Sequence, residues 1–158
     1  MHGELNISAA ELVQIWWWLY AIGLIAVVLT KVADVWSTWL KLGGAGDETN
    51  PFAAGLMHRW GFRTGIMIVS LIYVLILAVS TWAFAASLEF FVELAHSGWI
   101  GATLAWSAQC LVFAYLLLVS VVQAAVAHHN WTGRSYVITR RVLSFHSRWA
   151  RRFRSTIA

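Results

Sequence analysis

Lys31 and Asp34 are the residues whose types and spacing most clearly suggest chemistry. They lie three residues apart inside a long apolar stretch, so on a helix they share a face and can form an ion pair. Charged side chains in such a stretch are costly, and they often serve a proton or ion relay or a site for a polar substrate. The structural alternative is that the two charges neutralise each other while Lys31 extends toward water. The sequence leaves both interpretations open.

A second polar group follows in the segment Asp47-Glu48-Thr49-Asn50-Pro51. Its carboxylates and amide can join Asp34 around a metal ion or a cationic group. The segment also suits the start of a helix, because Asn50 is a good N-cap, Pro51 fits the first helical position and nearby acids favour the helix dipole. No histidine has ligand spacing to this segment. We therefore expect Asp47, Glu48, Asn50 and Pro51 to cap a helix, without a metal or other cofactor.

The histidines and the cysteine offer little further chemistry. His128 and His129 are adjacent, so on a helix they point about 100° apart and are poor joint ligands for one metal. Cys110 is the single cysteine, which excludes an internal disulfide and a cysteine-rich metal site. No catalytic residue can be assigned, and we predict that the protein is not an enzyme.

Three apolar stretches position these residues, at about residues 12–40, 65–91 and 99–127. Of the 158 residues, 60% are hydrophobic and only 11% are charged, more apolar than a soluble domain needs. Lipid cannot hydrogen-bond an exposed backbone, so stretches of this length form helices that cross a bilayer. We predict an all-α membrane protein with a three-helix transmembrane domain over residues 1–130 and a short cytoplasmic helix after the first loop.

The first helix has clear boundaries. Ser8-Ala9-Ala10-Glu11 reads as a capping box, and Gly43-Gly44 ends the helix after Leu42. A helix of that length spans about 50 Å, which exceeds a hydrocarbon core of about 30 Å, so it tilts or protrudes. Aromatic residues are expected at both membrane boundaries: Trp16, Trp17, Trp18 and Tyr20 in one belt, Trp36 and Trp39 in the other.

The basic residues predict the orientation. The first loop is flanked by Lys41, Arg59 and Arg63, and seven further arginines follow residue 130. The opposite side carries four acids and no lysine or arginine: Glu4, Glu11, Glu89 and Glu93. The positive-inside rule then places the N-terminus outside and the C-terminus in the cytoplasm. We expect a multi-pass protein of the bacterial plasma (inner) membrane.

The tail over residues 131–158 is predicted to be a basic amphipathic cytoplasmic helix. Its apolar residues recur every three or four positions: Ile138, Val142, Phe145, Trp149 and Phe153. Its arginines fall elsewhere on the helix: Arg140, Arg141, Arg148, Arg151, Arg152 and Arg154. Such a helix lies on the anionic cytoplasmic leaflet or docks on an acidic partner; we favour the anionic lipids and expect no nucleic acid.

The amides of Gln109 and Gln123 lie within the third stretch. A side-chain amide in lipid usually finds a partner on another helix. Gln123 is near the cytoplasmic end, where the simplest partner is Asp34 or Lys31. We expect that contact to tie the first and third spanning helices together.

The pattern Asp34-x3-Thr38, a glycine turn and Glu48-x-Asn50-Pro51 resembles a family of small prokaryotic integral-membrane proteins of unknown function. The resemblance covers roughly the first half of the chain and implies no catalytic residue. In size, topology and composition the whole chain is also similar to the small accessory subunits of mycobacterial Mce-type lipid transporters. That likeness implies a role beside a larger ABC-type transport complex.

Three functions fit the sequence. A non-catalytic accessory subunit of a larger membrane complex, such as a lipid transporter, fits the few helices and the large apolar surface. A homo-oligomeric carrier or channel would use Lys31 and Asp34 and would need self-assembly, since three helices cannot enclose a pore. An intramembrane lipid-modifying enzyme would use Asp34, Glu48 and Asn50 around a metal. We predict the accessory subunit.

Overall fold

The structure is a computed structural model that describes residues 7–41 and 51–133. It contains four helices: α1 (Ala9–Lys41), α2 (Pro51–Trp60), α3 (Phe62–His96) and α4 (Trp99–Thr132). Within those residues no β-strand occurs. Three of the helices, α1, α3 and α4, are long and apolar enough to cross a membrane. The prediction of an all-α membrane protein with three spanning helices is confirmed at this level.

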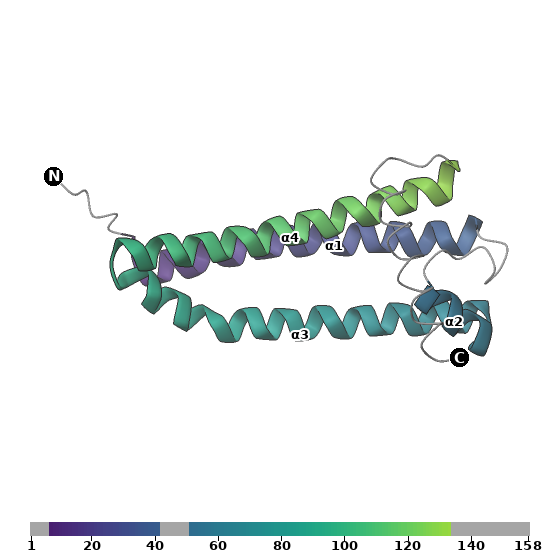
Figure 1. The fold of residues 1–158 in the computed structure, drawn as a ribbon, viewed down its shortest axis with the longest axis horizontal. Coiled ribbons are helices and arrows are strands. Elements are labelled where there is room, and N and C mark those ends of the chain that lie inside the picture. The colour runs from purple at the N-terminus through teal and green to yellow at the C-terminus, as the bar shows by residue number, and fades with distance from the viewer. Residues whose placement is uncertain (1–6, 42–50, 134–158) are drawn as a thin grey trace, which may run out of the picture.

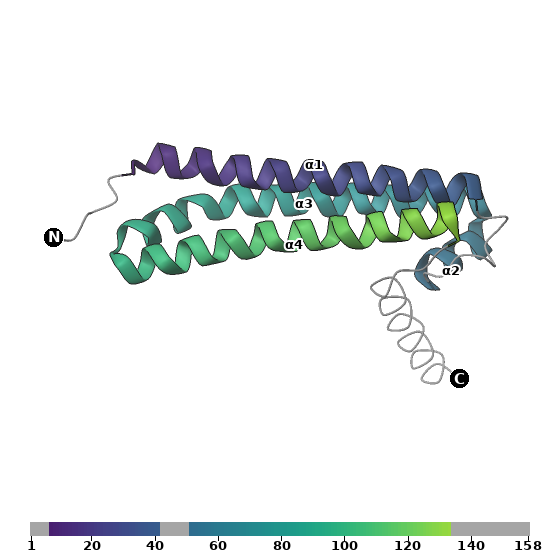
Figure 2. The ribbon, with the colours of Figure 1, turned by 90° about the horizontal axis from the view of Figure 1, so that it is seen from above.

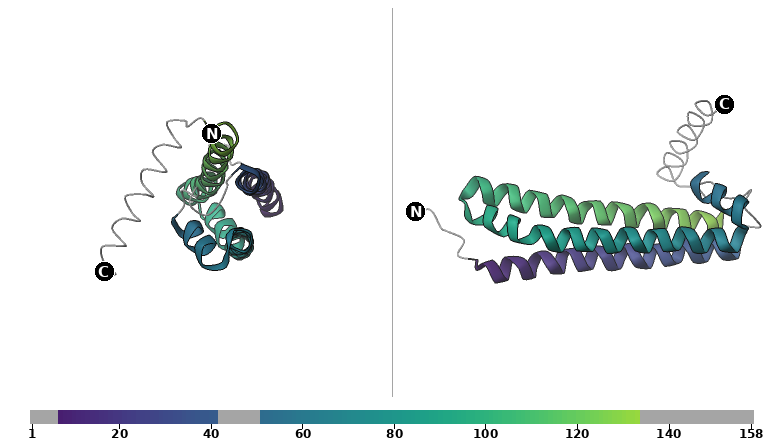
Figure 3. Two further views of the ribbon diagram at one scale, coloured as in Figure 1. Left: turned by 90° about the vertical axis from the view of Figure 1, so that its right-hand side faces the viewer. Right: turned by 90° about the horizontal axis from the view of Figure 1, so that it is seen from below.

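The long helices lie side by side in an elongated bundle (Figures 1 and 2). α1 and α4 run in the same direction, and α3 runs against them. The short helix α2 lies at the end of the bundle where α1 ends and α3 begins, beside α3 in the end-on view (Figure 3, left). The C-terminal ends of α1 and α4 therefore meet the N-terminal end of α3.

The predicted capping box at the start of α1 is confirmed. The backbone N–H and the hydroxyl of Ser8 each donate to Glu11 Oε2 over 2.8 Å, and the Glu11 N–H donates to Ser8 Oγ over 3.3 Å. These reciprocal bonds satisfy backbone groups that a helix start otherwise leaves open. They fix the beginning of a 33-residue helix of about 50 Å.

The helices extend further than the hydropathy of the chain predicts. α3 begins at Phe62 instead of residue 65 and continues to His96, so residues 92–96, which lie between the second and third predicted stretches, are helical and only Ser97 and Gly98 connect α3 to α4. The turn is tight because Gly98 has a φ of 117° and Ser97 Oγ donates to Leu94 O over 2.8 Å. α4 continues past residue 127 to Thr132, where Gly133 ends it in the left-handed conformation.

α1 and α4 form the most closely packed pair of helices. They meet where Trp16 packs on Trp106 and where Gly23 packs on Leu116. Gly23 makes the approach possible, since a Cβ there would lie 2.8 Å from Leu116 Cδ1 and 2.9 Å from Leu116 Cβ. Small residues that let backbones approach are the usual basis of helix association in lipid.

Two of the aromatic residues expected in a boundary belt lie in the core instead. Trp16 is 1% exposed and packs edge-on against Trp106 with ring centroids 5.8 Å apart. Tyr20 stacks on Phe84 at 4.1 Å, and its hydroxyl bonds Thr81 Oγ1 over 3.0 Å. Trp16 and Tyr20 lie four residues apart and so share the inner face of α1. The belt prediction considered residue type and not the position around the helix. The other four aromatic residues of the two predicted belts, Trp17, Trp18, Trp36 and Trp39, are exposed.

The short helix α2 folds back onto the start of α3. Its buried residues Ala53 and Met57 pack against Ile66, with Val35 of α1 alongside. Gly65 allows this contact, because a Cβ there would lie 2.6 Å from the Cα of Met57. The turn between the helices is made by Gly61 at a φ of 83°.

α3 is the least covered of the long helices. Only 6% of its most apolar 18-residue window is buried, against 28% for α1 and 17% for α4. Large apolar side chains are exposed along its length, and we call the following set the open face of α3: Met67, Leu71, Val74, Leu75, Val79 and Trp82. In a membrane, such a face meets lipid or another protein.

Candidate functional site

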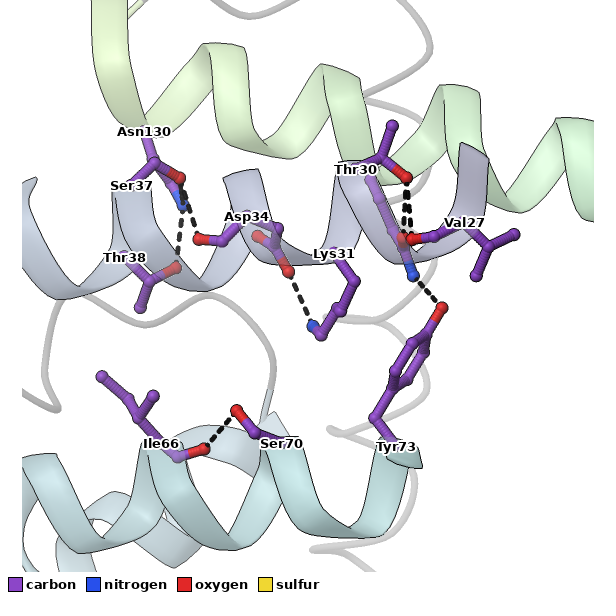
Figure 4. Close-up of polar contacts among 11 residues, drawn as sticks. Val27, Thr30, Lys31, Asp34, Ser37, Thr38, Ile66, Ser70, Tyr73 and Asn130 are labelled. Carbon is purple, nitrogen blue, oxygen red and sulfur yellow. Dashed lines mark hydrogen bonds and ion pairs between the residues drawn. The ribbon is translucent and has the colours of Figure 1, made fainter. Parts of the chain in front are cut away.

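A layer of polar side chains connects the three long helices (Figure 4). It consists of Thr30, Lys31 and Asp34 on α1, Tyr73 on α3 and Gln123 on α4, and we call it the polar layer. Lys31 extends from α1 toward α3, and Tyr73 extends from α3 toward α1 (Figure 4). The layer joins all three long helices through polar side chains.

The ion pair predicted from the spacing of Lys31 and Asp34 is present. Lys31 Nζ donates to Asp34 Oδ2 over 2.7 Å, and the two side chains are only 20% and 15% exposed. The ammonium also lies 5.2 Å from the centroid of the Tyr73 ring. A carboxylate and an aromatic face thus both stabilise the charge of Lys31, as a cation inside an apolar bundle requires.

Gln123 ties the helices together, but through partners other than Asp34 and Lys31, so that prediction was wrong. Thr30 Oγ1 lies 3.0 Å from Gln123 Oε1, and Gln123 Nε2 donates to the Tyr73 hydroxyl over 2.5 Å. The reason is angular: Thr30 precedes Lys31 by one residue, about 100° around the helix, and so it is Thr30 that faces α4. Gln123 therefore connects all three long helices, where the sequence indicated two.

A second polar contact lies further along the same pair of helices. Asn130 Nδ2 donates to Thr38 Oγ1 over 3.1 Å and lies 3.4 Å from Ser37 Oγ (Figure 4). Ser37 in turn donates to the carbonyl of Asp34 over 2.9 Å. Sequence reasoning missed Asn130 because it placed the end of the third span at residue 127. A parallel alignment of the first and third spans would have brought it level with Thr38.

Taking the exposed Trp18 and Trp36 as the two membrane boundaries places the polar layer at hydrocarbon depth. Trp18 and Trp36 are both exposed and stand 18 residues apart, about 27 Å along α1, which is close to one hydrocarbon thickness. Lys31 is five residues before Trp36, about 8 Å inside the nearer boundary. The ion pair lies in the third of α1 nearest its C-terminal end, which these boundaries place within the apolar region.

The remaining predicted site residues lie elsewhere. Gln109 is buried on α4. Pro51 begins α2. The other members of the predicted sites lie outside the described residues: Asp47, Glu48, Asn50, Arg140, Arg141, Arg148, Trp149, Arg151, Arg152 and Arg154. The capping role predicted for Asp47, Glu48 and Asn50 thus stays a prediction, and so does its alternative, a joining of the loop carboxylates to Asp34.

Residues 7–41 and 51–133 contain no group of three histidine, cysteine or acidic side chains close enough to hold a metal ion. Comparison of the chain with protein-family models, with curated proteins and with solved structures finds no match. The polar layer is therefore interpreted from its own geometry. Chemically it can neutralise charge, donate and accept hydrogen bonds and fix the positions of three helices.

Gln123→Leu is expected to weaken the folded state by about 1 kcal/mol, because a bond between membrane helices contributes about 0.6 kcal/mol and two are lost. The change should loosen α3 from the α1–α4 pair. Denaturant unfolding in mild detergent measures it, with Gln14→Leu at an exposed position of α1 as the matched control. Equal stability of the two variants would show that the bonds of Gln123 do not hold the helices together.

Proposed function

We propose that this protein is a non-catalytic accessory subunit that packs against and stabilises a larger membrane complex. The observation that carries the proposal is the open face of α3, which is nearly uncovered along the whole apolar window. Helix association in lipid relies on van der Waals packing, and the exposed side chains of the open face are available to pack against a second protein. The polar layer on the other side of α3 supplies the rigidity that a docking helix needs.

The proposed orientation has the N-terminus outside and the C-terminus in the cytoplasm of a bacterial plasma membrane. It is supported by the distribution of charge over the two ends of the bundle. Lys41, Arg59 and Arg63 lie at the end where α1 finishes, which we call the basic end. Glu11, Glu89 and Glu93 lie toward the opposite end, and no lysine or arginine of the described residues accompanies them there. The positive-inside rule places the basic end in the cytoplasm.

The complex that we propose as the partner is a lipid transporter of the ABC type. This part of the proposal rests on the similarity in size, topology and composition to Mce-type accessory subunits. The lipid setting of all three long helices is consistent with it. A subunit of this kind contributes contacts and positions, which matches a bundle whose polar groups bond mainly to one another.

A second candidate is a homo-oligomeric carrier, and the ion pair favours it. Lys31 and Asp34 lie at hydrocarbon depth and remain 20% and 15% exposed. If several copies of the chain placed the Lys31–Asp34 side of the bundle around a common axis, the ion pair would line a polar path. Such a carrier would purify as a defined oligomer of one chain.

Purification in mild detergent through a tag at the N-terminus separates the two candidates. An accessory subunit retains a partner in fixed stoichiometry, which mass spectrometry of the purified material identifies. A transporter among the retained proteins would support the full proposal. A larger species that contains only this chain would overturn it in favour of the carrier.

A further inference from the structure

The basic end of the bundle carries three cations, each placed over a tryptophan ring. Lys41 Nζ lies 4.5 Å from the centroid of Trp131, and the Arg63 guanidinium lies 5.6 Å from that of Trp39. The third pair, Arg59 and Trp60, is separated by 5.5 Å. Two of these contacts join different helices, Lys41 on α1 to α4 and Arg63 on α3 to α1. Such contacts order long side chains that would otherwise move freely in water.

The fold brings the two arginines to one corner. Arg59 is at the end of α2, Arg63 is in the first turn of α3, and only the Gly61 turn separates their helices. The close contact of Met57 with Gly65 keeps α2 folded against α3, so the corner is fixed. Trp39 adds a ring from α1 to the same corner. Arg63 and Trp39 thus join α3 to α1, and Arg59, four residues before Arg63 in the chain, adds a second guanidinium from the end of α2.

The positive charge of this corner is not neutralised by the part of the chain that the structure describes. The ion pair of Lys31 and Asp34 is the one salt bridge among those residues, and it leaves Asp34 already paired. Arg59 and Arg63 are exposed and make cation–π contacts alone there. Asp47 and Glu48 lie outside the described residues. A ligand that carries negative charge therefore complements the corner.

We propose that Arg59, Arg63 and Trp39 form a binding site for the headgroup phosphate of an anionic phospholipid in the cytoplasmic leaflet. A guanidinium held over an aromatic ring keeps N–H groups that bind phosphate oxygens, often in pairs. Tryptophan side chains favour the headgroup level, so Trp39 and Trp60 place the arginines at phosphate depth. Basic clusters between membrane helices on the cytoplasmic side are suited to acidic headgroups.

The site is distinct from the surface attraction expected of the C-terminal arginines, because it depends on a fixed corner of α1, α2 and α3. It rests on the proposed orientation and not on the accessory role. Lipid binding by the purified chain needs no partner complex. Failure of the lipid site would therefore leave the proposal for the open face of α3 untouched, and the reverse also holds.

The test is a titration of delipidated protein in mild detergent with phosphatidylglycerol, followed by native mass spectrometry. We expect wild-type protein to bind phosphatidylglycerol in preference to phosphatidylcholine with the same acyl chains. The double variant Arg59→Gln/Arg63→Gln should bind it about 30-fold more weakly, since each basic side chain near a lipid surface contributes about 1 kcal/mol. Trp39→Leu, which leaves the net charge unchanged, should weaken binding about threefold by releasing Arg63.

The matched control is Arg151→Gln/Arg154→Gln, which removes the same charge from the tail. Binding by this control should remain within about twofold of wild type, because the proposed site predicts that Arg59 and Arg63 supply the headgroup contacts and the tail does not. An equal loss in both double variants would overturn the site in favour of general charge attraction. Equal binding of the two phospholipids would also overturn it. Displacement of phosphatidylglycerol by inorganic phosphate at the same concentration would show that the corner binds free phosphate instead of a lipid headgroup.

Discussion

Asp34→Ala is expected to destabilise the folded protein by about 3 kcal/mol, the largest effect of any polar substitution in the bundle. The change leaves the Lys31 ammonium at hydrocarbon depth with the Tyr73 ring as its remaining described partner. Breaking a buried pair costs more than the pair contributes, because the surviving charge is left without compensation. Denaturant unfolding and size-exclusion behaviour in mild detergent measure the loss.

The double variant Lys31→Met/Asp34→Leu is the control for this prediction. It removes both charges and keeps side chains of similar volume, so stability should return to within about 1 kcal/mol of wild type. If the Asp34→Ala variant is as stable as wild type, Lys31 reaches water and the ion pair is not required for stability. If the double variant recovers stability but no longer retains the partner complex, the ion pair has a role beyond holding the three helices together.

Gly23→Leu is expected to separate α1 from α4 and to cost about 3 kcal/mol or more. The first added carbon would lie within 3.0 Å of Leu116 Cβ, an atom that cannot turn away, and Phe113 Cδ2 stands 3.4 Å from the same point. Since these two helices form the closest contact of the bundle, the change acts on its main packing surface. Thermal unfolding in detergent, followed by loss of helix signal and by aggregation, measures the effect.

Gly55→Leu is the matched control, because a Cβ at Gly55 meets no atom within 4 Å. It should leave stability unchanged or raise it by up to about 1 kcal/mol, because Leu has a higher helix propensity than Gly. Equal behaviour of the two variants would mean that the approach of α1 and α4 does not depend on Gly23, and that the parallel pair is not the core of the fold.

The features that the sequence predicts correctly are local ones. The Ser8–Glu11 capping box and the Lys31–Asp34 pair each depend on residues three apart on a single helix. Their geometry follows from the helix alone and needs no knowledge of neighbouring elements. The three spanning helices are equally predictable, because lipid leaves few alternatives for long apolar stretches.

The features that it misses depend on how the helices rotate against one another. Gln123 bonds Thr30 and Tyr73 because of the rotation of α1 and α4, which hydropathy does not report. Trp16 was assigned to a membrane boundary by its type, yet its position on the inner face of α1 buries it against Trp106. In a chain that is apolar all round, hydrophobic periodicity is too weak to tell the inner face from the outer.

The most direct test of the accessory-subunit proposal is photo-crosslinking in native membranes from the open face of α3. A photoreactive residue replaces Val79, which is 63% exposed, or in the control Val27, which is 1% exposed. We predict that position 79 captures one distinct membrane protein in high yield and that position 27 captures none. Capture of a second copy of this chain from position 79, or of no protein at all, would contradict the proposal.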